Sequence, residues 1–181
     1  MRLRRVLPRV NLQSDDFELF GLPAQFSQSR AELDARWKQL QREVHPDRFA
    51  DQGQAAQRLA LQWSVRINEA YQRLKDPLKR AAYLCELRGA PIRAHDNTAM
   101  PASFLVRQMQ WREALDEADS AAALQTLSAQ TQVEQTTLLD RLADSLDRTG
   151  DLQEAVAQVR ALMFIERFAR EIDARCDQMC A

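Results

Sequence analysis

The chain has 181 residues, of which 45% are hydrophobic and 28% charged, and its formal net charge is −1. This composition fits a folded globular protein rather than a disordered chain, and the absence of a positive excess argues against a general nucleic-acid binder. With only four glycines and six prolines available for turns, it favours a mostly helical protein of one domain or two small ones.

Residues 1–14, MRLRRVLPRVNLQS, carry four basic and no acidic residues. They contain no uninterrupted apolar core, so they make a poor secretory signal, and no later stretch approaches the length of a membrane span. We therefore expect this segment to be a disordered basic leader.

The three cysteines, Cys85, Cys176 and Cys180, include no CxxC pair. An odd number does not suit a disulfide framework, so the expected compartment is a reducing cytoplasm. Cys176 and Cys180 stand four residues apart, but two thiols alone are a weak metal site. We expect free thiols and neither a metal nor a cofactor.

The first predicted elements are a short helix and a helical hairpin. The stretch SDDFELFGLP predicts a helix that is capped by Ser14 and ended by Gly21. The next helix begins at Ser27 or Ser29, and its apolar residues recur at helical steps in one buried stripe. The stripe comprises Leu33, Trp37, Leu40 and Val44. A third helix, roughly residues 54–75, can pack antiparallel to it through a similar stripe.

Between these two long helices lies the tripeptide His45-Pro46-Asp47. Proline removes a backbone donor and restricts the residue before it, so Pro46 is expected to end the helix near His45 and to place the tripeptide at the exposed hairpin tip. From the residues alone, the tripeptide is either a structural turn, in which Asp47 caps backbone donors, or a fragment of a catalytic or metal site that lacks a nearby nucleophile.

The helix before the tripeptide has a basic side. Lys38 and Arg42 lie one turn apart and away from the apolar stripe, while Arg36 lies nearer to its flank. A run of charge on a helix is commonly just a solvated face, and partner binding is the alternative.

A short linker, RGAPIRAHDNTAM, leads to three further predicted helices at about 101–118, 121–147 and 151–178. Periodicity predicts the residues that face the core of this second part. On the first helix they are Phe104, Trp111, Leu115, Ala118 and Ala122. On the last helix they are Leu152, Val156, Val159 and Met163.

Other apolar side chains fall outside these core stripes. Leu105, Val106 and Met109 point elsewhere and are bordered by polar and acidic residues, which makes a reasonable partner surface and leaves self-association open. On the last helix, Phe164 and Phe168 lie off the core side, and periodicity alone slightly favours a three-helix bundle that buries two faces of this helix.

The hairpin, its basic side, the tripeptide and the following INEAYQRLKDPLKRAAY together resemble a J-domain, the module by which co-chaperones stimulate ATP hydrolysis by DnaK-class chaperones. The resemblance implies no catalytic residue, so an enzyme is not expected. It implies a chaperone-binding surface that comprises His45, Pro46, Asp47, Arg36, Lys38, Arg42 and Arg48. Arg48 stands where the family often has lysine, which differs from arginine in hydrogen-bonding geometry.

From Asp15 onward, the segments DDFELFGLPAQF and SFLVRQMQWREALDEAD resemble the HscB family of J-domain co-chaperones in iron–sulfur cluster assembly. The resemblance implies an all-α fold, with a J-domain at 15–88, a linker at 89–100 and a C-terminal three-helix bundle at 101–181. It implies two protein partners, the chaperone HscA and the scaffold IscU, and promotion of cluster transfer, with no role for nucleic acid or membrane.

The scaffold-binding surface that the resemblance implies comprises Leu105, Val106, Met109, Gln110, Glu113, Glu117 and Phe164. Val106 stands where a longer apolar residue is typical, and Gln110 where an acid is typical. Two other functions stay open: a J-domain protein that delivers a different client, and a helical adaptor in which the tripeptide is incidental.

Overall fold

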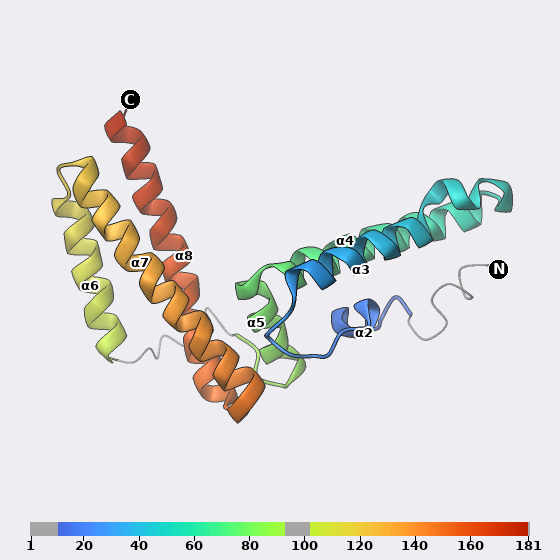
Figure 1. The fold of residues 1–181 in the computed structure, drawn as a ribbon, viewed down its shortest axis with the longest axis horizontal. Coiled ribbons are helices and arrows are strands. Elements are labelled where there is room, and N and C mark those ends of the chain that lie inside the picture. Colours follow the sequence, from blue (N-terminus) through green and yellow to red (C-terminus); the bar gives the residue numbers. More distant parts are fainter. Residues whose placement is uncertain (1–10, 93–101, 181) are drawn as a thin grey trace. The chain divides into compact units, whose positions relative to one another are not determined.

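The computed structural model describes residues 11–92 and 102–180 (Figure 1). All regular elements in these two ranges are helices, which confirms the predicted all-α class. The chain divides between Arg80 and Ala81 into two compact units. The first ten residues of the expected leader and most of the expected linker lie outside the described residues, whereas residues 11–14 form a turn.

The first unit is built on a helical hairpin. The helices α3 (Arg30–Val44) and α4 (Gln54–Lys75) pack against each other, and the short α2 (Asp16–Phe20) contacts both. A 3₁₀ helix, η1 (Pro46–Gln52), joins the hairpin, and α5 (Pro77–Leu87) follows it across the division between the units. The interior includes four completely buried side chains, Leu33, Val44, Ile67 and Leu74.

The cap of α2 corrects the prediction by one residue. Asp15, not Ser14, is the N-cap, and its Oδ1 accepts the Glu18 N–H at 2.8 Å. Ser14 instead accepts the Asn11 N–H at 3.1 Å within the preceding turn. Both residue types cap helices well, so local preference does not decide between them. Gly21, with φ at 63°, ends the helix in the left-handed conformation as predicted.

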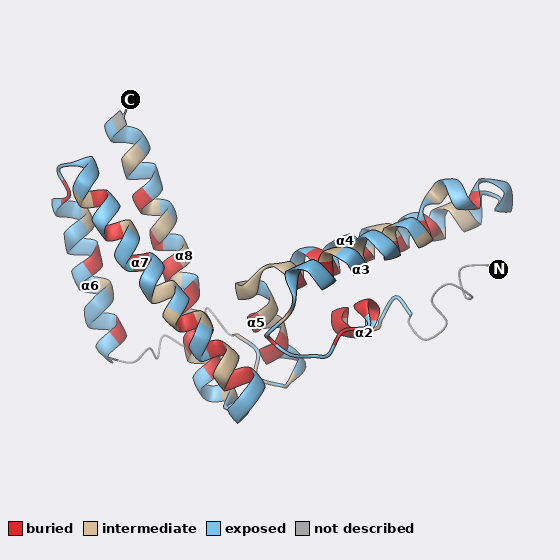
Figure 2. Cartoon of the chain, viewed as in Figure 1, coloured by how far each residue is buried: buried red, intermediate tan, exposed pale blue. Residues whose placement is uncertain are grey.

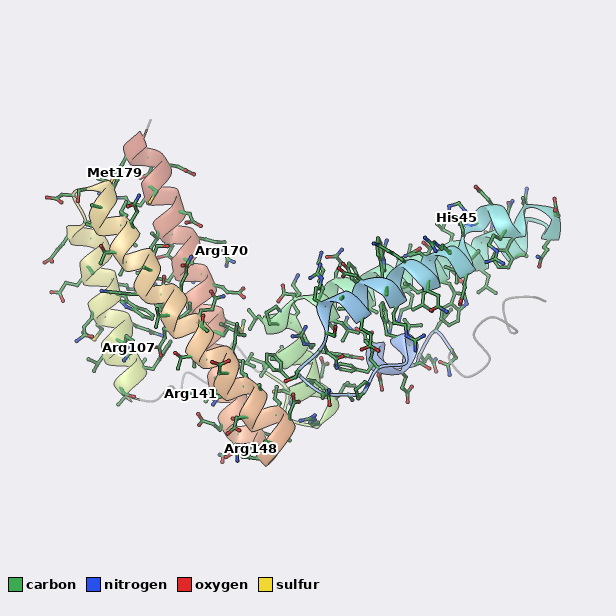
Figure 3. The ribbon with its side chains drawn as sticks, in the orientation of Figure 1. His45, Arg107, Arg141, Arg148, Arg170 and Met179 are labelled. Carbon is green, nitrogen blue, oxygen red and sulfur yellow. The ribbon has the colours of Figure 1, made fainter. Side chains whose placement is uncertain are left out.

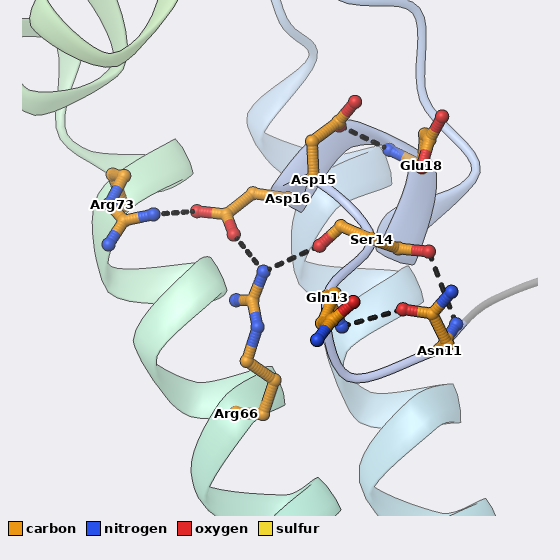
Figure 4. Close-up of polar contacts among 8 residues, drawn as sticks. All are labelled: Asn11, Gln13, Ser14, Asp15, Asp16, Glu18, Arg66 and Arg73. Carbon is orange, nitrogen blue, oxygen red and sulfur yellow. Dashed lines mark hydrogen bonds and ion pairs between the residues drawn. The ribbon is translucent and has the colours of Figure 1, made fainter. Parts of the chain in front are cut away.

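Asp16 lies in the first turn of α2, and its carboxylate is completely buried. Figure 4 shows its contacts with Arg66 and Arg73. Asp16 Oδ2 accepts a hydrogen bond from Arg73 at 2.8 Å, and Oδ1 lies 2.6 Å from Arg66 Nη2. Both arginines belong to α4, so this buried charge is balanced by two cations, as a buried carboxylate requires. The contact fixes α2 to the hairpin.

Trp37 in the predicted stripe of α3 is half-buried rather than buried. Its indole N–H donates to Asn68 Oδ1 at 2.9 Å, and its ring stacks on Tyr71 with centroids 4.8 Å apart. An indole needs a polar partner for its N–H, so the edge of the hairpin suits it better than the interior.

The hydroxyl of Tyr71 donates to Asp34 Oδ1 at 2.7 Å, and Arg30 Nε donates to the same oxygen at 2.9 Å. The Tyr71 hydrogen bond lowers the pKa of Asp34 and raises the pKa of Tyr71, and the Arg30 charge also lowers the pKa of Asp34. Because its folded-state pKa is lowered, Asp34 stabilises the fold above its ordinary pKa, and this contribution is lost as the pH falls through the folded-state pKa.

We expect Tyr71→Phe to raise the pKa of Asp34, because the hydrogen bond that favours its ionised form is removed. Wild type should then lose more stability than the variant on acidification below about pH 4, the ordinary range of aspartate. An NMR titration of the Asp34 carboxyl carbon measures the first effect, and thermal melts across that pH range measure the second. An unchanged pKa in the variant would mean that the neighbouring cations, Arg30 and Lys38, set it without the Tyr71 hydrogen bond.

The second unit contains α6 (Ala102–Glu117), α7 (Ala121–Ala143), a π-helical turn η2 (Asp144–Thr149) and α8 (Leu152–Cys180). α7 packs against both α6 and α8, and Gly150, with φ at 70°, ends η2 before α8 begins. This arrangement confirms the predicted C-terminal helical domain (Figure 1). None of the described helices combines the length and apolar content needed to cross a membrane.

The core of the second unit corrects two predicted positions. Figure 2 shows the buried residues spread over α6, α7 and α8. Ala122 and Met163, expected in the core, are exposed, whereas Phe168 is completely buried. Phe168 belongs to a cluster that draws side chains from α6, α7 and α8, so α8 buries a broader face than one stripe. The buried positions of α8 are Ala155, Gln158, Val159, Ala161, Leu162, Ile165, Phe168 and Ile172.

Candidate functional site

The tripeptide lies at the tip of the α3–α4 hairpin, as predicted (Figure 3). α3 ends at Val44, and Pro46 begins η1, where its missing N–H leaves no hydrogen bond unmade. The side chains of His45 and Asp47 are 58% and 89% exposed. Both groups are therefore displayed to solvent by the helix stop.

The capping geometry at the tip differs from the prediction. His45, not Asp47, supplies the cap: its Nδ1 accepts the Asp47 N–H at 3.3 Å, while Asp47 Oδ2 lies 3.5 Å from that nitrogen. Since the cap of η1 uses the histidine ring, the Asp47 carboxylate is not needed to hold the turn. It remains available to a partner.

Phe49 anchors η1 and was not assigned a role from the sequence. It is 3% exposed and is the buried residue of η1, which packs against α4. The signal in the sequence is an aromatic residue two positions after Asp47 in an otherwise polar turn. A buried ring beneath an exposed tip restricts the tip without occupying its surface.

We expect Phe49→Ala to loosen this turn, because removing a buried ring leaves a cavity in place of its packing contacts. Amides of η1 should exchange with solvent at least about tenfold faster, which corresponds to about 1.4 kcal/mol of local stability. Hydrogen exchange followed by NMR measures this change. Phe49→Leu, which keeps most of the apolar volume, is the matched control, and equal exchange in wild type and Phe49→Ala would contradict the anchor.

The basic residues on α3 differ in exposure. Lys38 and Arg42 are exposed, whereas Arg36 is half-buried. Arg48 Nη1 donates to the Arg42 carbonyl at 3.2 Å, which satisfies a carbonyl in the last turn of α3. Arg48 is itself exposed while one of its nitrogens is occupied within the hairpin, so Lys38, Arg42 and Arg48 all present positive charge to solvent.

These groups do not form an enzyme-like constellation. His45 and Asp47 are exposed side by side on one short turn, where water competes for their hydrogen bonds and no nucleophile accompanies them. Within the described ranges, no group of three or more histidine, cysteine, aspartate or glutamate side chains is arranged to hold a metal ion. The tip can offer hydrogen bonds and charge to a partner protein.

A second exposed surface lies on α6. Leu105, Val106 and Met109 are 42%, 54% and 72% exposed, as their position outside the core stripe predicted. Gln110, Glu113 and Glu117, on the same helix, are exposed as well. We call these six residues the α6 patch: an apolar centre with an acidic border.

Phe164 of α8 is placed differently from the α6 patch. It is half-buried, and its ring lies 5.8 Å from that of Phe104 and 6.4 Å from that of Trp111. The Arg112 guanidinium lies 5.7 Å from the Phe164 ring centroid, where a cation–π interaction is favourable. Phe164 thus packs with the aromatic core of the unit and exposes only part of its surface to a partner.

Comparison with protein families matches both parts of the chain. Residues 15–83 match the DnaJ domain, and residues 100–173 match a family described as the HSCB C-terminal oligomerisation domain.

Close relatives span almost the whole chain. The co-chaperone protein HscB homolog of Burkholderia multivorans is 49% identical over 173 residues, which cover 94% of this chain and 98% of the relative. The corresponding homolog of Paraburkholderia phytofirmans is 46% identical with the same coverage.

Solved structures agree with these matches. The chaperone HscB from Vibrio cholerae is 35% identical, with a TM-score of 0.77 over 92% of this chain and 99% of that one. The human co-chaperone protein HscB is 28% identical, with a TM-score of 0.85 over 92% and 84% of the two chains.

Proposed function

Because the chain belongs to the HscB co-chaperone family, we propose that it stimulates the ATPase of the DnaK-class chaperone HscA and delivers to it the iron–sulfur scaffold IscU. The family is non-enzymatic, and a J-domain implies an Hsp70 partner. Delivery of the scaffold would promote cluster transfer and the maturation of iron–sulfur proteins. The bacterial relatives and the unpaired thiols of Cys85 and Cys176 support action in the cytoplasm.

The observation that supports the chaperone role most directly is the exposed tip. His45 and Asp47 project from a turn that ends α3, and the backbone there is held by the His45 cap and the buried Phe49. A preformed tip loses little conformational entropy on docking, which favours binding. Lys38 and Arg42 add positive charge that attracts an acidic surface and raises the association rate.

The tip contributes no chemical group to ATP hydrolysis. Its effect follows from binding more tightly to the conformation of the ATPase domain that hydrolyses ATP than to the one that does not, so binding shifts the population of states. A charged, hydrogen-bonding group such as the Asp47 carboxylate suits this role, because its interactions depend strongly on the geometry of the partner.

The α6 patch supports the scaffold role. Burial of Leu105, Val106 and Met109 would supply most of the binding energy, at about 25 cal/mol for each Å² of apolar surface removed from water. Glu113 and Glu117 would orient a basic partner and speed its association. Gln110 contributes no charge, so partner preference at this position rests on hydrogen bonding.

A different client is the second candidate, because the exposed apolar patch that supports scaffold binding fits any partner with a complementary apolar and basic surface.

We also infer that the chain self-associates, since the family that matches residues 100–173 is described as an oligomerisation domain.

Steady-state ATP hydrolysis by HscA of the same organism tests the proposal, with this protein and IscU added separately and together. The proposal expects each alone to stimulate hydrolysis modestly and the pair to exceed the sum of the two. If IscU does not increase the stimulation of HscA by this protein, the result would favour the different client.

A further inference from the structure

One long stretch of the second unit is nearly free of charge. Residues 120–139, SAAALQTLSAQTQVEQTTLL, contain Glu134 as their single charged residue, although 28% of the whole chain is charged. The stretch coincides with most of α7. Leu124, Leu127 and Leu138 are buried and form the core side of this stretch. Burial in the core therefore does not explain why the other side of the stretch carries so little charge.

Between Ala122 and Thr136 the outward side of α7 carries no charge, and the exposed Asp140 follows one turn later. Figure 2 shows α7 with much of its length exposed. Ala122, Thr126, Ala129, Val133 and Thr136 follow one another at helical steps of three and four, and all five are exposed. We call these five residues the α7 face. Val133 is 68% exposed, more than Leu105 or Val106 in the α6 patch.

The charge of Glu134 is neutralised from the neighbouring helix. Its Oε2 accepts a hydrogen bond from Arg107 of α6, and the two form an ion pair. This pair lies in the wall of a groove of about 810 Å³ between α6 and α7. The α7 side of the groove includes Thr126, Ala129 and Val133 of the α7 face, and its α6 side includes Trp111, Ala114 and Gln110, the last of which also belongs to the α6 patch. The α7 face therefore continues into a hollow whose two charged residues are paired with each other.

We propose that the α7 face is where two copies of this chain contact each other. In a two-fold contact the same surface meets itself, so every charge on it faces a like charge from the other copy or must be paired elsewhere. The α7 face carries none, and the neighbouring Glu134 is already paired within its own chain. Charge depletion combined with exposed apolar groups also characterises the centres of protein interfaces.

The α6 patch does not suit the same partner. Its border carries Glu113 and Glu117, which would repel their copies in a two-fold contact and favour a basic protein instead. The two surfaces thus differ in the chemistry of the partner they fit. The inference rests on the self-association proposed above and is independent of the chaperone and scaffold roles.

The size of the α7 face sets the strength of the contact. At 1.5 Å per residue, the helix from Ala122 to Thr136 is about 22 Å long. One helix face and its groove offer less than the roughly 800 Å² that each partner contributes to a standard stable interface. The association should therefore be weak and depend on protein concentration, and Ala129, near the middle of the face, should lie close to the two-fold axis.

Sedimentation of the full chain over a range of concentrations tests the proposal through two opposite changes at one exposed position. Ala129→Glu and Ala129→Lys should each raise the dimer dissociation constant at least about tenfold, because like charges then meet near the axis. An equimolar mixture of the two variants should restore association. Met109→Glu, which introduces the same charge at an exposed position of the α6 patch, is the control and should associate like wild type.

Three results would overturn the proposal: a wild type that stays monomeric at every concentration, Ala129 variants that associate like wild type, or association that only Met109→Glu abolishes. Circular dichroism melts establish that each variant is folded, which is expected because both new side chains are good helix formers at a solvent-facing site. Stimulation of HscA by Ala129→Glu, measured separately, shows whether the chaperone role holds when the self-contact is lost.

Discussion

Replacing Asp47 by asparagine is expected to abolish stimulation of HscA, leaving ATP hydrolysis at its unstimulated rate to within experimental error. Asparagine keeps the size and shape of the side chain and removes its charge, so the difference reports on the carboxylate itself. The fold of the tip should be unchanged, because the turn is capped by His45 and anchored by Phe49. Steady-state ATP hydrolysis with saturating amounts of each variant measures the loss.

Asp51→Asn is the matched control for this prediction. Asp51 is an exposed carboxylate on the same 3₁₀ helix, so the substitution makes the same change in charge a few residues away. It should preserve stimulation, whereas a general effect of charge on the hairpin tip would lower both variants equally. Full stimulation by Asp47→Asn would instead favour a helical adaptor in which the tripeptide is an incidental turn.

Truncating two apolar side chains of the α6 patch is expected to weaken the binding of IscU strongly. Leu105→Ala combined with Met109→Ala should weaken binding of IscU by about 3 kcal/mol, or roughly a hundredfold in the dissociation constant, because two exposed apolar side chains lose the surface that the partner would bury. Isothermal titration of IscU into the protein measures the change. Stimulation of HscA in the absence of IscU should stay at the wild-type level, since the tip is untouched.

Met163→Ala is the control for the α6 patch. Met163 is an exposed methionine of α8 in the same unit, so its truncation removes exposed apolar surface from a different place. IscU binding that is unaffected by the Leu105 and Met109 changes would remove the α6 patch from the scaffold role. If the J-domain variant still behaved as expected, the different client would then become the leading candidate.

Local rules predicted the hairpin well. Pro46 ends α3 within one residue of the expected position, and Gln54–Lys75 forms a helix with the predicted limits, because proline geometry and apolar periodicity act over a few residues. The exposure of Leu105 and Met109 follows from the same periodicity, since a side chain off the core stripe of a surface helix faces solvent.

The wrong predictions fall where two residues suit a helix cap equally well, or where contacts with other helices decide which side chains are buried. Ser14 and Asp15 are both good caps, and only the distant Arg66 and Arg73 select the frame that buries Asp16. Likewise, periodicity along α8 places Met163 in the core, because it cannot show which sides of the helix the two neighbouring helices cover. These contacts join residues far apart in the sequence, and a single sequence carries no direct signal of them.

Some features of the candidate surfaces could likewise be predicted from the sequence, and others could not. The exposure of His45, Asp47 and the α6 patch could be predicted from the sequence, whereas Phe49 could not be assigned as the anchor because one aromatic residue in a turn has no periodicity to place it. The half-burial of Phe164 depends on Phe104 and Trp111 of another helix.

The central claim is that one chain joins the chaperone to the scaffold, so the decisive measurement mixes two defective variants. Asp47→Asn retains the α6 patch, and the Leu105→Ala, Met109→Ala variant retains the tip; both would carry Ala129→Glu to prevent contact between copies. We predict that HscA and IscU with the equimolar mixture show no more ATP hydrolysis than with the patch variant alone, because delivery requires both surfaces on one chain. Restoration of the wild-type synergy by the mixture would contradict delivery and show that the two surfaces act independently.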